Sequence, residues 1–219
     1  MRKGRFAGYE YYHIYNRGIE KKSLFLDNED RLRFLTLLLL FQGDVLFPQI
    51  SRIIPTVKHL MFDRKPLDRE IVNTVLGSRI VELVCFTFMP NHFHLILKPL
   101  DEGHIPKFMQ RLGNAYAKYF NKRYQRKGHL FESTYSSIHI DNNEYLNHLS
   151  AYIHLNIGKM KYWRGKEEKY PWSSFQDYIT ENRFGKFLAP RIVLDQFSHG
   201  KEYLHFVKSG DYSCQTLDV

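Results

Sequence analysis

Cysteine is nearly absent from this chain of 219 residues. Its two cysteines, Cys85 and Cys214, lie far apart and form no CxxC pair, so the sequence offers neither a disulfide framework nor a cysteine-based metal site. Glycine and proline are also sparse, at 13 and 8 residues, which excludes collagen-like and low-complexity architectures. These absences predict a globular protein of a reducing compartment whose stability comes from its hydrophobic core.

Long hydrophobic runs are missing as well. The longest apolar stretch, residues 34–41, is far too short to cross a bilayer. The N-terminal residues are basic but lack the apolar segment of a secretory signal peptide. We therefore expect no membrane partner and a cytoplasmic location.

Positive charge is in excess, and the excess is localised. The chain has 32 Lys and Arg against 23 Asp and Glu, a formal net charge of +9. Residues 98–127 hold eight basic and two acidic residues, and residues 159–169 hold five and two, so these two segments account for the whole excess (+6 and +3). Such clustering predicts a polyanionic partner, of which nucleic acid is the common kind.

Hydrophobic periodicity predicts an α+β protein. Alternating residues indicate strands at 11–17 and 135–140 and a hairpin of 80–88 and 92–97. Helical spacing indicates helices from Asp27 or Asn28 to Gly43, over 106–124, and from a cap at Asp141 or Asn142 to Ile157. This order predicts a ferredoxin-like antiparallel sheet with helices on one face. We expect one domain over residues 1–180, in which 44–78 form an insertion or a long loop, followed by a C-terminal helical appendage at 181–219.

Two histidines in the hairpin stand out. His92 and His94 are two residues apart in a predicted strand, so their rings project from one face and are able to converge on a metal ion. They lie beside apolar strand residues, where unpaired polar rings are costly. The structural alternatives are packed or solvated histidines, or a zinc site for which neither cysteine is suitably spaced.

The helix predicted at 142–157 offers partners for these rings. Tyr152 and Asn156 are four residues apart and therefore share one helix face. Asn156 would supply an amide oxygen as a third ligand, and two imidazoles with one oxygen leave positions open on Mg²⁺ or Mn²⁺. A phenol, with a pKa of about 10, attacks a phosphodiester only when a nearby cation polarises the phosphate. The alternatives are that Tyr152 simply packs, or that Tyr145, one heptad earlier, is the nucleophile.

Four motifs carry a resemblance to a known family: FTFMPNHFHLIL at 86–97, RKGHLFESTYSS at 126–137, YIHLN at 152–156 and PWSSFQDY at 171–178. In this order they resemble the single-tyrosine HUH transposases, especially those related to the REP-associated tyrosine transposases. The resemblance implies an HUH endonuclease type of fold and a metal-dependent endonuclease and strand transferase of single-stranded DNA. It implies that His92 and His94 bind the metal, that Tyr152 forms a 5′-phosphotyrosine link and releases a 3′-hydroxyl, and that Asn156 completes the metal site.

The resemblance also concerns the DNA. Family members hold hairpin DNA and its flanking single strand in basic grooves, which fits the two charged segments. Lys107, Arg111, Lys118 and Lys122 lie on one side of the predicted helix 106–124. The candidate DNA-binding residues are therefore Lys107, Arg111, Lys118, Lys122, Arg123, Arg126 and Lys127. A bacterial or archaeal cytoplasm, association with the nucleoid, and a homodimer or a monomer are the corresponding expectations.

Two departures from the family pattern are visible. Ile157 and Gly158 follow YIHLN where proline is usual, and Glu132 stands where glutamine is common. Neither change removes a proposed ligand or the nucleophile. The rival hypotheses are a domesticated nucleic-acid-binding protein without catalysis and a metal-dependent nuclease that activates water.

Overall fold

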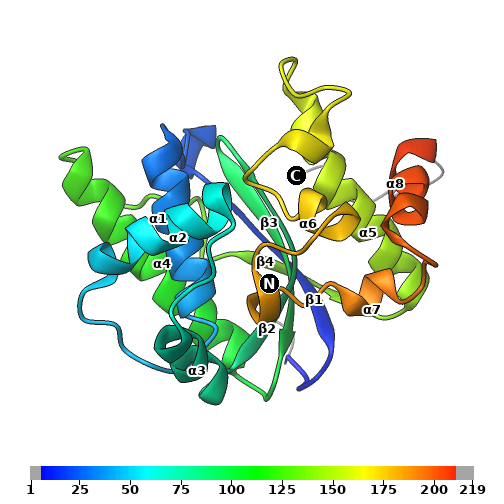
Figure 1. The fold of residues 1–219 in the computed structure, drawn as a ribbon. Helices are drawn as coiled ribbons and strands as arrows, with labels where there is room; N and C mark the ends of the chain where they lie inside the picture. The colour runs from blue at the N-terminus through cyan, green and yellow to red at the C-terminus, as the bar shows by residue number, and fades with distance from the viewer. Residues whose placement is uncertain (1–5, 211–219) are drawn as a thin grey trace.

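The computed structural model describes residues 6–210 and contains one four-stranded sheet (Figure 1). The strands are β1 (Tyr11–Arg17), β2 (Val81–Met89), β3 (His92–Pro99) and β4 (Ser136–Ile140). Their order across the sheet is β2-β3-β1-β4, and every pair is antiparallel. This order and the β-α-β-β-α-β succession are those of the ferredoxin-like arrangement, so the predicted α+β fold class is confirmed.

The structure has helices of several lengths, and side-chain caps begin two of those that flank the sheet. The α-helices are α1 (Asn28–Leu40), α2 (Ile50–Asp63), α3 (Arg69–Gly77), α4 (His104–Arg123), α5 (Asn143–Leu155), α6 (Phe175–Ile179), α7 (Arg191–Leu194) and α8 (Gly200–Ser209). The 3₁₀ helices are η1 (Ile19–Lys21), η2 (Asn156–Lys159), η3 (Glu167–Lys169) and η4 (Gly185–Phe187). Asp27 caps α1 by accepting the Asp30 N–H, and Asn142 caps α5 by accepting the Tyr145 N–H.

Helices cover both faces of the sheet. Phe93, Leu95 and Leu97 of β3 pack into a core with α1 and α4, whereas Ile96, on the opposite face, packs into a second core with α5 and α8 (Figure 1). The prediction of helices on one face holds for α1 and α4 but is wrong for the molecule as a whole. The reason is that β2 and β3 are apolar on both faces, so each face has to be covered.

The structure differs from the sequence prediction for residues 44–78 and agrees with it for the C-terminal segment. Residues 44–78 form α2 and α3 rather than a long loop, and α2 packs against α1 through Val57, Leu60 and Met61. The C-terminal segment contains the short helices η4, α7 and α8, and α8 packs against α5. Cys214 lies outside the described residues. Over residues 6–210, no helix is long and apolar enough to cross a membrane.

Candidate active site

The histidine pair lies in the middle of the sheet. His92 and His94 of β3 are paired across the sheet with Arg17 and Tyr15 of β1, so these four side chains share one face. The two imidazole rings are nearly perpendicular, with centroids 5.0 Å apart. His94 is fully buried and His92 half-buried. The face that carries them is the one covered by α5.

His94 is held from two sides. Its Nδ1 lies 2.9 Å from Nε2 of His13, and its Nε2 lies 3.3 Å from the amide nitrogen of Asn156. The Asn156 side chain is buried, and within the described residues its Oδ1 has no hydrogen-bond partner. A buried amide oxygen without a partner keeps its lone pairs unused beside the histidines. The structure therefore brings together His92, His94 and Asn156, as the sequence predicts.

Tyr152 joins this cluster from α5. Its ring packs edge-on against His94, with centroids 5.8 Å apart, and the Nζ of Lys159 lies 5.6 Å from its ring centre. Helix α5 ends at Leu155, and η2 continues from Asn156, which places Lys159 next to the tyrosine. The rival Tyr145 belongs to the first turn of α5, about 10 Å along the helix axis from Tyr152.

Burial keeps the histidines uncharged. Loss of hydration lowers the pKa of His92 to about 4, helped by the nearby positive charges of Arg17 and Lys159. The same cause lowers the pKa of His94 well below its ordinary value and that of His13 to about 3. Neutral imidazole is the form that binds a metal ion. At neutral pH the pair is therefore in the protonation state that coordination requires.

The donor set fits a divalent cation of the Mg²⁺ or Mn²⁺ kind. In residues 6–210 no group of three or more His, Cys, Asp and Glu side chains is placed to hold a metal ion. The cluster instead offers two neutral imidazoles and the unused amide oxygen of Asn156, a buried acceptor whose desolvation is otherwise uncompensated. Few protein ligands with several open positions are typical of ions that also bind phosphate oxygens.

Two residues of this site were missed by the sequence reasoning. His13 contacts His94, and Arg17 lies beside His92 with its Nε buried and without a hydrogen-bond partner among the described groups. Their spacing in the predicted strand at 11–17 shows that they share a face. What the sequence lacks is the register that places this strand next to the histidine strand. No local pattern supplies it, because the two strands are about 80 residues apart.

The predicted DNA-binding residues lie elsewhere. Helix α4 covers the sheet face opposite to the histidines. Three of its predicted cations have partners: Lys107 pairs with Asp44 at 2.6 Å, Arg111 donates to the carbonyls of Gly43 and Val45, and Arg123 pairs with Asp27, Glu29 and Asp30. Arg126 stacks on Phe120 and Lys127 is exposed. These residues are not brought together with Tyr152.

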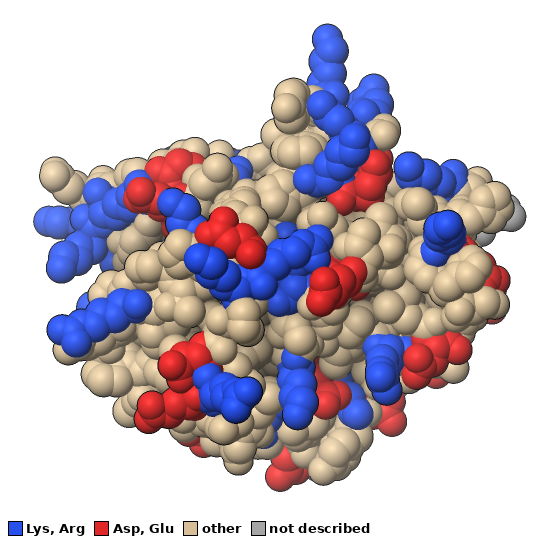
Figure 2. Space-filling model, viewed as in Figure 1, with Lys and Arg blue, Asp and Glu red and all other residues tan. Residues whose placement is uncertain are grey.

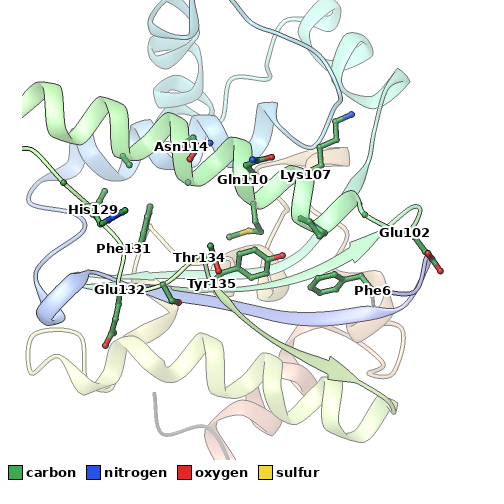
Figure 3. Close-up of a pocket in the computed structure, with 18 residues that line it drawn as sticks. Phe6, Glu102, Lys107, Gln110, Asn114, His129, Phe131, Glu132, Thr134 and Tyr135 are labelled. Carbon is green, nitrogen blue, oxygen red and sulfur yellow. The ribbon is translucent and has the colours of Figure 1, made fainter. Parts of the chain in front are cut away.

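Two α4 cations remain at the surface without ion pairs in the described part of the chain. Lys118 and Lys122 line a cavity of about 570 Å³ together with Arg33 of α1. A second cavity, of about 1320 Å³, lies between α4 and residues 128–135. Figure 3 shows Gln110 and Asn114 of α4 facing Phe131 across it. Both cavities are lined by α4, so neither is the Tyr152 cluster.

Comparison with known proteins supports the family of transposases that the sequence motifs resemble. Residues 57–156 match the family described as "Transposase IS200 like", and this stretch contains all four residues of the predicted cluster. The match confirms the resemblance to single-tyrosine transposases. A solved structure described as "Structure of the REP associates tyrosine transposase bound to a REP hairpin" is 15% identical, with a TM-score of 0.47 and coverage of 86% of this chain and 90% of that chain. No match was found among curated proteins.

Proposed function

We propose that this protein is a metal-dependent DNA transesterase that cleaves and rejoins single-stranded or hairpin DNA through Tyr152. The observation that carries the proposal is the packing of Tyr152 against His94, at the point where His92, His94 and the unused oxygen of Asn156 meet. A phenol next to a cation site is the arrangement that attack on a phosphodiester requires. The match to the IS200-like transposases supports the same class of reaction.

In the proposed step, the Tyr152 oxygen attacks the phosphorus of one DNA phosphodiester. The phenol loses its proton as the new bond joins the tyrosine to the 5′-phosphate. The bond from phosphorus to the 3′-oxygen breaks, and that oxygen takes up a proton to become the 3′-hydroxyl. A 3′-hydroxyl later reverses the reaction and joins strands. The energy of the phosphodiester is kept in the phosphotyrosine, so the reaction needs no ATP, which agrees with the lack of a GxxxxGK[ST] loop.

His92, His94 and Asn156 would hold Mg²⁺ or Mn²⁺, which supplies Lewis-acid stabilisation of the charge on the phosphate. Arg17, whose guanidinium lies beside His92, is placed to neutralise a phosphate oxygen. Lys159 is placed to stabilise negative charge near the Tyr152 ring. His13 acts through His94, because its hydrogen bond to Nδ1 leaves Nε2 facing Asn156.

The partner in this proposal is DNA with hairpin repeats. Lys118 and Lys122, with Arg33, would bind backbone phosphates at the far face of the sheet, because they line an open cavity and are not neutralised by acids of the described chain. Lys107, Arg111 and Arg123 would act less directly, since each holds an internal partner.

The decisive test is incubation with 5′- and 3′-labelled DNA hairpins and Mn²⁺, followed by a denaturing gel. Hairpins from repeats flanking the gene are the substrates of choice. We expect a label retained on wild-type protein through its 5′-phosphate fragment and lost in Tyr152→Phe and His92→Ala. Tyr145→Phe is the matched control and should form the adduct normally.

Other outcomes identify the rivals. Hairpin binding without any adduct would indicate a DNA-binding protein that does not cleave. Cleavage that persists in Tyr152→Phe but is lost in Tyr145→Phe would move the nucleophile to Tyr145, and cleavage that survives both changes would indicate attack by water.

A further inference from the structure

A basic segment leaves the site directly after Asn156. We call residues 159–169 the basic arm; they project from the body of the protein at the end of α5 (Figure 1). The arm carries five Lys and Arg and two Glu. In Figure 2 the blue side chains gather on this projection. Its first residue, Lys159, already lies against Tyr152.

The positive charge of the arm is available to a partner. Within the described residues, none of its five cations forms an ion pair, in contrast to Lys107, Arg111 and Arg123 of α4. Neither of its two acids pairs with a cation of the arm. Glu168 pairs with Lys208 at 3.5 Å, and Glu167 is buried and accepts the Gly165 N–H at 2.8 Å. The arm therefore exposes cations that lack local counter-charges.

The arm also presents an aromatic surface. Tyr162 is 69% exposed, and Nζ of Lys166 lies 3.8 Å from its ring centre. Trp163 meets Tyr162 edge-on at 5.0 Å and packs on Tyr170 at 5.1 Å. The Tyr170 hydroxyl donates to the Phe88 carbonyl of β2 at 2.7 Å. The exposed ring of Tyr162 is therefore connected to β2 through Trp163 and Tyr170.

The arm folds back onto its base at Gly158. A Cβ on Gly158 would lie 2.5 Å from Oε1 of Glu167, so a larger residue there would require the end of this side chain to shift. Backbone hydrogen bonds from Trp163 and Arg164 to the Met160 carbonyl then form successive turns. The arm is consequently fixed relative to Tyr152 at its first residue and to the sheet at its end.

We propose that the basic arm holds the unpaired strand next to the phosphate attacked by Tyr152, with a base stacked on Tyr162 and phosphates bound by Lys161, Arg164 and Lys166. This inference rests on the proposed function. Exposed aromatic rings flanked by cations bind single-stranded nucleic acid without sequence preference, because every base has a face to stack. Bases in a duplex are already stacked and would use only the cations. The combination of ring and charge therefore favours an unpaired strand over the hairpin stem.

The test measures affinity in a Tyr152→Phe background, so that no cleavage occurs. The probes are one fluorescent DNA hairpin with blunt ends and the same hairpin with an oligothymidylate extension of about ten nucleotides. Tyr162→Ala should weaken binding of the extended hairpin by roughly 5- to 150-fold, the range of one lost base stack. Tyr9→Ala is the matched control, because Tyr9 is 66% exposed and also has a lysine near its ring.

A triple variant tests the charges. Lys161→Gln, Arg164→Gln and Lys166→Gln together should reduce the slope of log affinity against log salt by about 2, since a single strand contributes roughly 0.7 per phosphate. The control triple, Lys58→Gln, Lys65→Gln and Arg69→Gln, removes exposed cations of residues 58–69 and should leave the slope for the extension unchanged. Quenching of Trp163 fluorescence by the extension, absent in Trp163→Phe, provides a second readout.

Each outcome separates this inference from the proposed function. Equal losses on blunt and extended hairpins would assign the arm to the stem and overturn the proposal. Unchanged affinities in all arm variants, in a protein whose Tyr152 form yields the adduct, would overturn it while the transesterase stands. Selective loss of extension binding, in a protein that yields no adduct, would support the arm while the transesterase fails.

Discussion

At the residue scale, the site depends on how His94 is oriented. His13 fixes its Nδ1 side, so His13→Ala should weaken Mn²⁺ binding about 10- to 100-fold, the usual effect of removing a group that orients a metal ligand. His13→Gln offers an amide at the same place and should restore part of the affinity. Mn²⁺ titration followed by electron paramagnetic resonance measures this directly. Unchanged affinity in a folded His13→Ala protein would contradict the orienting role.

Arg17 supports a second prediction at this scale. Its buried Nε and its position beside His92 suit a group that binds the reacting phosphate. We expect Arg17→Ala to lower the single-turnover cleavage rate about 100-fold, as is common when one donor to a developing oxyanion is lost. The rate of Arg17→Lys should fall between those of the wild type and Arg17→Ala. Arg52 is an exposed arginine on α2, and Arg52→Ala serves as the control. A changed affinity with an unchanged rate would mean that Arg17 only helps DNA to bind.

At the element scale, a buried carboxylate joins α1 to α4. Asp30 is fully buried and accepts hydrogen bonds from Arg123, Tyr119 and Tyr124. Asp30→Ala should lower the free energy of unfolding by about 2 to 4 kcal/mol, because Arg123 and two hydroxyls lose a buried partner. Glu29→Ala removes a carboxylate that meets the same arginine but is 80% exposed, so about 0.5 kcal/mol or less is expected. Urea unfolding of both variants measures these free energies. Equal losses of unfolding free energy in the two variants would contradict the role of burial.

The same scale shows what the sequence was able to predict. The strand with His92 and His94 and the helix with Tyr152, at whose end Asn156 lies, follow from local periodicity and from the cap at Asn142. That the two elements meet followed only from reasoning about unpaired rings and from the family resemblance. The participation of Arg17 depends on strand register, and the cover of both sheet faces depends on tertiary packing. Such long-range facts have no local pattern.

The basic residues show a further limit of sequence-based prediction. Periodicity correctly placed the α4 cations on one helix, yet charge density alone did not show which of the two basic segments would adjoin Tyr152. The larger segment lies across the sheet, and the smaller one begins beside the tyrosine. The DNA-binding assignment of the α4 residues stays a prediction.

At the scale of the whole molecule, the C-terminal helix α8 supports α5, the helix that carries Tyr152. The hydroxyl of Tyr203, on α8, lies 2.7 Å from Nδ1 of His154 and 2.9 Å from Oγ of Ser150, both on α5. Tyr203→Phe would leave a buried imidazole nitrogen without this partner, and we expect a loss of about 1 to 3 kcal/mol in unfolding free energy. Tyr162→Phe removes an exposed hydroxyl and should leave stability unchanged. Equal stability of the two variants in urea would show that α5 does not rely on this bond.

The sheet separates the cations of α4 from the cations next to Tyr152. This separation predicts that variants on the two sides will differ in DNA affinity and in cleavage rate. Lys118 and Lys122 lie across the sheet from Tyr152, so a Lys118→Gln and Lys122→Gln protein should bind hairpin DNA more weakly but cleave bound DNA at the wild-type rate. If both lysines bind duplex phosphates, the slope of log affinity against log salt should fall by about 2. Arg17→Ala should show the converse pattern, a slower step with a slope that falls by at most about 0.7, because only one phosphate contact on the single strand is lost. Single-turnover rates at saturating DNA, measured across a salt series, distinguish the two. A slower chemical step in the double-lysine variant would mean that DNA bound at the far face positions the phosphate at Tyr152, and the two surfaces would then have to be treated as one continuous path for the DNA.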